Sequence, residues 1–224
     1  MYDANKVDLA KVAHKSVLLG FVGCLSVYGM VNGYCRIGVF VLLLCIFHYM
    51  EFLSTYYFNT SQVDDDSFIM EDQDLHMVYI GSLVEYGVRK AIEYYFDIPI
   101  DIKVLVVIGL VLTVIGQTTR SLAMYTAKQS FNHYIQREQT SKHQLVTTGV
   151  YRYLRHPSYF GFWWWFIGLE LWLGNFVILI LGGYQLWNFF NKRIEFEEKF
   201  LVDFFQNDYI TYRQSTKTWI PLIN

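Results

Sequence analysis

Long apolar runs, separated by short polar segments, dominate the pattern of this chain. Residues 16–35 carry no charge over 20 positions, which is the length that a helix needs to cross a bilayer. The runs 37–58 and 103–127 are of similar length, and each has one charged residue well inside it, Glu51 and Arg120. These runs predict three membrane-spanning helices.

A fourth apolar run is too long for one span. Residues 157–191 comprise 35 positions with a single charge. A straight helix of that length would reach roughly 52 Å, whereas the apolar slab of a bilayer is about 30 Å thick. We therefore expect the chain to fold back once. Gly174-Asn175 is a typical turn sequence and predicts two spans, 157–173 and 175–191.

Residues 75–96 are a weaker candidate for a span. Either this helix spans with its polar side toward protein, or it lies at the membrane interface. With it, the chain is predicted to be an all-α, polytopic integral membrane protein of about six transmembrane helices. Four charged side chains interrupt the segment: Glu85, Arg89, Lys90 and Glu93.

Composition supports the membrane class. Hydrophobic residues make up 54% of the chain and charged residues 17%, where a soluble domain carries about 25% charged residues. The net charge of −2 argues against a nucleic-acid-binding protein. Cys24, Cys35 and Cys45 lie in apolar runs without CxxC spacing, so we expect neither a disulfide framework nor a metal site.

Basic residues predict the orientation. With six spans, the segments 1–15, 128–156 and 192–224 lie on one side, and they hold 13 of the 18 lysines and arginines. By the positive-inside rule this side is cytosolic. The loop 59–74 shares the side yet has six acids and no basic residue, which weighs little because acids contribute little to the rule.

Arg120 is the residue that most strongly indicates a functional site, because a charge within an apolar segment is costly unless it is paired. It is either an anion clamp, since guanidinium binds carboxylate through two hydrogen bonds, or an arginine that snorkels or pairs with a structural carboxylate. Arg193 and Glu197 are four residues apart and share a helix face. Spacing alone favours a surface ion pair for them.

The segment before the fourth run is a second candidate site. In Arg155-His156-Pro157-Ser158-Tyr159, proline opens a helix whose N-terminus attracts anions, or the segment is simply a basic cap at the membrane edge. No HExxH pattern, phosphate loop or GxGxxG occurs, so a nucleotide-like cofactor would not be held in the Rossmann manner.

The residues HQLVTTGVYRYLRHPSYFG, followed by RIEFEEKFL, resemble the C-terminal signature of the isoprenylcysteine carboxyl methyltransferase family. The C-terminal half alone is also similar to phospholipid methyltransferases and, more loosely, to sterol reductases. Upstream residues that separate the first family from these relatives extend the resemblance over most of the chain, in its shorter, six-span form. They are Phe47-His48-Tyr49-x-Glu51, Ser82-Leu83-x-Glu85-Tyr86, Arg120, Ala123-Met124 and Phe131-Asn132-His133.

The resemblance implies methyl transfer from S-adenosylmethionine to the C-terminal carboxylate of a farnesylated or geranylgeranylated cysteine. The acceptors are processed CaaX proteins such as small GTPases, and the enzyme sits in the endoplasmic reticulum membrane with its site toward the cytosol. Residues 1–127 would form the transmembrane helices and admit the lipid substrate, and residues 128–224 would form the catalytic region.

Site residues carried over by the resemblance fall into two groups. Arg120 and Arg193 fall where the family handles substrate and catalysis, and Glu197 falls in both the catalytic and the cofactor set. The remaining cofactor residues are Gln136, His143, Gln144, Leu145, Val146, Tyr151, His156, Pro157, Ser158 and Tyr159.

Three rival functions remain open at this point. A phospholipid methyltransferase would methylate an amine and has no need of Arg120. A sterol reductase would use a nicotinamide cofactor, although this chain is short for one. A non-catalytic lipid-binding membrane protein would bind no cofactor tightly and would tolerate substitution of Glu197.

Overall fold

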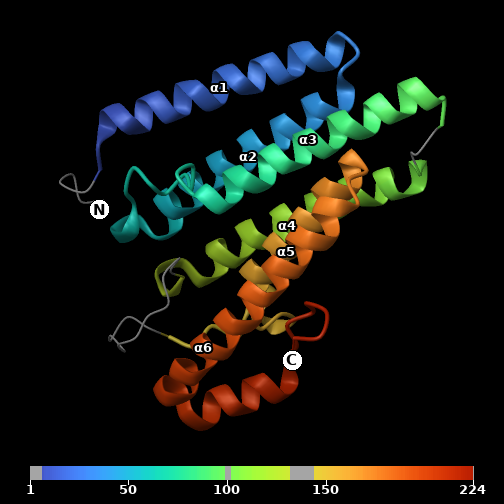
Figure 1. Cartoon of the computed structure of the whole chain (residues 1–224). Helices are drawn as coiled ribbons and strands as arrows, with labels where there is room; N and C mark the ends of the chain where they lie inside the picture. The colour runs from blue at the N-terminus through green and yellow to red at the C-terminus, as the bar shows by residue number, and fades with distance from the viewer. Residues whose placement is uncertain (1–6, 99–101, 132–143, 224) are drawn as a thin grey trace.

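The computed structural model describes residues 7–98, 102–131 and 144–223. Within these ranges the chain forms six α-helices and three short 3-10 helices, which confirms the predicted all-α class (Figure 1). The α-helices are α1 Leu9–Val31, α2 Cys35–Phe58, α3 Gln73–Phe96, α4 Lys103–Ala127, α5 Pro157–Leu173 and α6 Val177–Ser215, and the 3-10 helices are η1 Thr60–Gln62, η2 Lys128–Ser130 and η3 Gly149–Arg152.

The four helices α2 to α5 begin and end within two residues of their predicted spans, whereas α1 covers Leu9–Val31 rather than 16–35. Within the described ranges, α1, α2 and the helix that contains α4 are long and apolar enough to cross a membrane. The fourth apolar run does fold back, because Gly174 ends α5 in the left-handed conformation at φ 76°. Glycine adopts this conformation without the steric cost that a side chain brings.

One helix extends well beyond its predicted span. α6 has 39 residues and does not end near residue 191. At 1.5 Å per residue, the part from Val177 to Phe205 alone is roughly 44 Å long, which exceeds the ~30 Å thickness of the apolar slab. Gln206, with φ 46° and ψ −124°, bends the helix there. Figure 1 shows the last turns folding back beneath the bundle.

The polar side of α3 faces protein. The Glu85 carboxylate accepts the backbone N–H groups of Phe176, Val177 and Ile178 at 2.7, 2.8 and 2.7 Å, and so caps the start of α6. The hydroxyl of Ser82 donates to the buried Glu170 carboxylate of α5 at 2.7 Å. These contacts place the polar side of α3 against α5 and the start of α6.

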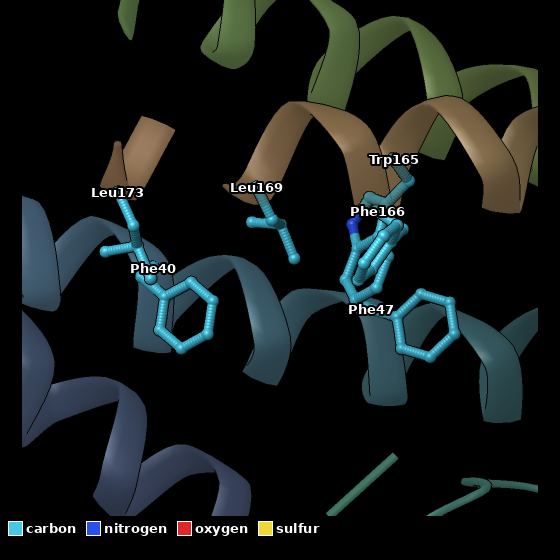
Figure 2. Close-up of a cluster of buried hydrophobic side chains, with 6 residues drawn as sticks. All are labelled: Phe40, Phe47, Trp165, Phe166, Leu169 and Leu173. Carbon is cyan, nitrogen blue, oxygen red and sulfur yellow. The ribbon is translucent and has the colours of Figure 1, made fainter. Parts of the chain in front are cut away.

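The bundle core lies between α2 and α5. Figure 2 shows Phe40 and Phe47 of α2 facing the side chains of α5. Phe47 stacks on Trp165 with ring centroids 4.4 Å apart. On its other side α5 packs closely against α4, where glycines let the two backbones touch. This contact places the start of α5 against the last two turns of α4.

Candidate functional site

A pocket lies at the end of the bundle where α4 ends and α5 begins. It is open to solvent on one side, and both polar and apolar side chains line it. Its lining includes nine residues of the predicted cofactor set: Gln144, Leu145, Val146, Tyr151, His156, Pro157, Ser158, Tyr159 and Glu197. The other two, Gln136 and His143, lie outside the described residues.

Two contacts hold the loop of this pocket in place. Gly149 has φ 58° and packs on α4, where an added Cβ would lie 2.9 Å from Cγ2 of Thr126. The hydroxyl of Tyr212 donates to the carbonyl oxygen of Tyr151 at 2.6 Å. The loop is thus fixed to α4 on one side and to the returning end of α6 on the other. Burial raises the pKa of the Tyr151 hydroxyl, which therefore stays a neutral hydrogen-bond donor.

Tyr159 connects the two residues of α6 that the sequence predicts to be functional. Its hydroxyl donates to the Glu197 carboxylate at 2.6 Å and accepts from Nε of Arg193 at 2.8 Å. The guanidinium of Arg193 also lies over the Tyr159 ring, 5.5 Å from its centroid. The predicted pair Arg193 and Glu197 is therefore part of a polar cluster at the pocket, rather than an isolated surface ion pair.

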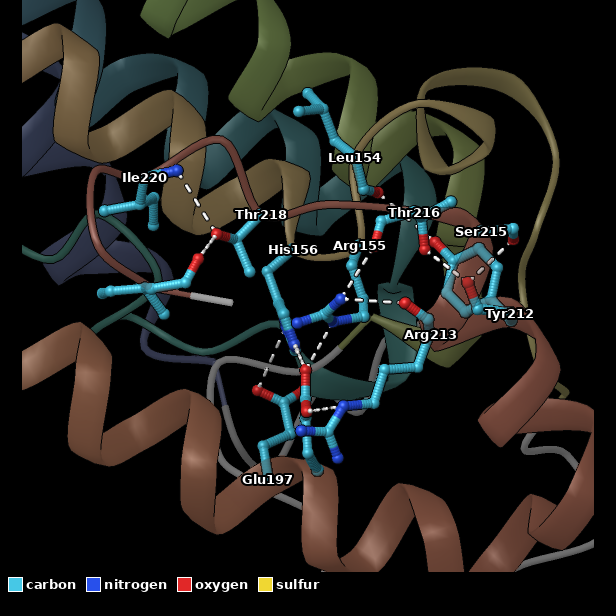
Figure 3. Close-up of polar contacts among 12 residues, drawn as sticks. Leu154, Arg155, His156, Glu197, Tyr212, Arg213, Ser215, Thr216, Thr218 and Ile220 are labelled. Carbon is cyan, nitrogen blue, oxygen red and sulfur yellow. Dashed lines mark hydrogen bonds and ion pairs between the residues drawn. The ribbon is translucent and has the colours of Figure 1, made fainter.

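A buried ionic network supports the pocket from behind. The Glu198 carboxylate accepts from Nε of Arg155 at 2.5 Å, lies 3.1 Å from Nε2 of His156 and pairs with Arg213 at 3.1 Å. Figure 3 shows these three basic side chains converging. Burial alone would raise the pKa of Glu198, but the hydrogen bond and charge of His156, together with Arg155, hold it at about 2. Glu198 is therefore ionised at neutral pH.

Arg120 is paired within the membrane. Its Nε and Nη2 donate to the two carboxylate oxygens of Glu51 at 2.5 and 2.8 Å, and its Nη1 donates to Oγ of Ser158 at 2.9 Å. Arg120 is only 8% exposed and does not itself line the pocket. The pairing matches one of the two alternatives that the sequence left open. Ser158 nevertheless connects the guanidinium to the pocket wall.

Sequence reasoning missed the part of the lining that α6 supplies. Leu201 and Phe205 follow Glu197 at intervals of four residues, so a helical face could have revealed them. Tyr209 and Tyr212 reach the pocket only because α6 bends at Gln206, which no residue pattern indicates. The remaining lining residues outside the predicted set are Ala127, Ser130, Phe131 and Arg155.

Together, the fold and the site define an integral membrane protein with a pocket of mixed polar and apolar lining at one end of its helix bundle. The family model of the isoprenylcysteine carboxyl methyltransferase family matches residues 107–203. Protein-S-isoprenylcysteine O-methyltransferase of Saccharomyces cerevisiae is 35% identical over 99% of this chain and 95% of its own length. The Homo sapiens protein of that name is 33% identical over 95% and 75%.

A solved structure of the eukaryotic intramembrane Ras methyltransferase is also similar, with a TM-score of 0.86 at 34% identity. The match covers 93% of this chain and 75% of that chain. The chain belongs to the isoprenylcysteine carboxyl methyltransferase family.

Proposed function

We propose that this protein methylates the C-terminal carboxylate of a prenylated cysteine, with S-adenosylmethionine as the methyl donor. Its family membership supports the reaction class. The observation that carries the proposal is the pocket, where residues from a loop, α5 and α6 converge beside two arginines. A non-catalytic lipid-binding protein would not need this cluster of ionisable side chains beside its pocket.

The polar groups of the pocket match those of the donor. S-adenosylmethionine has an amino group, a carboxylate and an adenosine, and when bound it supplies a methyl group on a positively charged sulfur. We assign the amino group to the Glu197 carboxylate, whose side chain is 27% exposed. Nη2 of Arg155 is buried and has no hydrogen-bond partner among the described residues, so it suits the carboxylate. Tyr151 and the loop 144–146 would enclose the adenosine.

The acceptor needs positioning rather than deprotonation. A terminal carboxylate has a pKa of about 3.5 and is already ionised at neutral pH, so no general base is required. The chain's task is to orient this carboxylate and to remove water from it. We assign its orientation to Arg120, which reaches the pocket wall through Ser158, and to Arg193, which reaches it through Tyr159.

The membrane location follows from the two substrates. A prenyl chain gains about 0.8 kcal/mol for each CH₂ that stays in lipid, so it reacts without leaving the bilayer. The methyl donor is polar and arrives from water. The pocket lies near the polar end of the helix bundle, where a prenyl chain in the bilayer and a methyl donor from water can meet. We propose the endoplasmic reticulum membrane, with the pocket facing the cytosol, and processed CaaX proteins such as small GTPases as acceptors.

Purified protein, labelled S-adenosylmethionine and N-acetyl-S-farnesylcysteine test the reaction. The expected product is a base-labile methyl ester. Phosphatidylethanolamine, run in parallel, should stay unlabelled, because its acceptor would be an amine. Labelled phosphatidylethanolamine without ester would identify a phospholipid methyltransferase instead, and folded protein that binds no methyl donor would exclude both.

Two substitutions test the assigned roles. Arg120→Ala should lower turnover far more than affinity for the methyl donor, because Arg120 lies behind the pocket wall. Glu197→Gln should weaken donor binding, because it removes the charge that faces the amino group. If Arg120→Ala instead weakens donor binding and Glu197→Gln lowers turnover alone, the assignments are wrong.

A further inference from the structure

A buried carboxylate on α2 contacts the proposed machinery without lining the pocket. Glu51 is 1% exposed and lies within a membrane-spanning helix, where an unpaired charge is costly. We infer that Glu51 is a positioning residue for methyl transfer, which sets the direction in which the Arg120 guanidinium acts. The inference rests on the proposed function and deepens it.

The geometry of the pair fixes the rotation of the guanidinium in its own plane. Glu51 accepts from Nε at 2.5 Å and from Nη2 at 2.8 Å, so it holds one whole edge of Arg120. A guanidinium is planar and rigid, so holding that edge directs Nη1 to the opposite side. There Nη1 donates to Oγ of Ser158 at 2.9 Å.

Aromatic rings restrict the guanidinium further. The Cζ atom of Arg120 lies 5.7 Å from the ring centroid of Phe47 and 5.3 Å from that of Phe162. Arg120 is thus surrounded by residues of α2 and α5. Because Phe47 and Glu51 are four residues apart on α2, one helix face supplies both a ring and the carboxylate.

The chain of hydrogen bonds ends at the pocket wall. Ser158 accepts from Arg120, so the hydrogen of its own hydroxyl is directed elsewhere. Ser158 lines the pocket, and a ligand there is a suitable acceptor. Glu51 therefore acts on the reaction through Arg120 and Ser158, from a helix that contributes nothing to the described pocket lining.

Glu51→Gln tests this role. The isosteric amide cannot accept from both nitrogens of Arg120, because its own NH₂ group is a donor. We expect turnover to fall about 10- to 100-fold, as for a reacting group misplaced by about 1 Å. Affinity for the methyl donor should stay at the wild-type value. A purely structural ion pair would instead lower thermal stability and leave the turnover of the folded fraction unchanged.

Glu170→Gln is the matched control. Glu170 is equally buried, at 1% exposure, but it faces Ser82 and Asn175 at the other end of the bundle. An amide can keep a hydrogen bond to each partner, so this variant should retain turnover. A double variant, Glu51→Gln with Arg120→Gln, should be no slower than Arg120→Gln alone, because the two residues act as a unit.

The outcomes separate the inference from the proposed function. Wild-type protein that forms no ester overturns the proposed function itself. With active wild type, folded Glu51→Gln at full turnover overturns the inference, and so does equal loss of donor affinity. If Glu51→Gln does not fold, Glu51→Asp keeps the charge but draws the guanidinium toward α2. It should then lower turnover with donor binding intact, and wild-type turnover in this variant would also overturn the inference.

Discussion

Gly161 is the position where a single added methyl group should affect both stability and turnover. It lies in the first turns of α5, against α4. A Cβ at this position would lie 2.6 Å from the carbonyl oxygen of Gly116, and 2.7 and 2.8 Å from N and Cβ of Arg120. None of these atoms can rotate away. Ordinary carbon contacts are about 3.5–4.0 Å, so Gly161→Ala must separate the two helices by roughly 1 Å.

The size of the effect follows from this displacement. Overpacking of a close contact typically costs about 1–3 kcal/mol, and a backbone contact belongs at the upper end. The same shift moves Ser158, three residues earlier on α5, away from Arg120. A hydrogen bond of 2.9 Å that lengthens by roughly 1 Å is lost. We expect turnover to fall about 100-fold if the guanidinium positions the acceptor.

Thermal unfolding and methyl ester formation, both in detergent, measure the two effects. Gly87→Ala is the control: Gly87 is also a helical glycine, in α3, and an added Cβ would meet nothing within 4 Å. Alanine there should be neutral or stabilising by up to about 1 kcal/mol. If Gly161→Ala melts and turns over like Gly87→Ala, the close contact between α4 and α5 does not control the site.

Three further predictions concern the polar end of the protein. The pKa of Glu198 is held at about 2, below its ordinary 4.5, so its contribution is complete above about pH 4.5 and is lost as the pH falls toward 2. Glu198→Gln should therefore lose stability at neutral pH and show a flatter acid-unfolding curve by circular dichroism; an unchanged curve would contradict the network. Tyr212→Phe removes the hydrogen bond to the Tyr151 carbonyl, so it should cost about 1 kcal/mol in thermal unfolding and raise the KM for the methyl donor. Gly149→Ala should raise the same KM, because φ 58° and the contact with Thr126 both oppose a side chain; unchanged donor binding would mean that the loop tolerates the shift.

The membrane-spanning part of the fold could be predicted because the bilayer leaves a direct mark on sequence. Long runs with few charges and the Gly174 turn predicted five of the helices, whereas the charges in 75–96 left α3 undecided between a span and an interfacial helix. No comparable sequence pattern predicts the extension of α6. Beyond residue 191 the helix carries charges on several faces, and its bend falls at Gln206, which is not a helix-breaking residue.

Only part of the candidate site could be predicted from the sequence. Most of the residues proposed to bind the cofactor lie between Gln136 and Tyr159, so a local motif that resembles the family was enough to predict them. Glu51 and Arg120 are 69 residues apart, and neither spacing nor hydropathy pairs them. Each looked like an isolated charge in an apolar run, which indicates that a partner exists but does not identify it. Only the packing of α2 against α4 supplies that identity.

The chemistry of the two substrates explains why the pocket lies at the end of the bundle. The acceptor carries an apolar chain and an ionised carboxylate, and the donor is polar throughout, so the reacting atoms must meet where lipid gives way to water. Arg120 brings a positive charge to this boundary from inside the membrane, which is tolerable only because Glu51 neutralises it. Arg193 brings a second charge from the α6 extension beyond the membrane. The close contact of α4 with α5 holds Arg120 against Ser158, so under the proposed function it would set where the guanidinium meets the pocket wall.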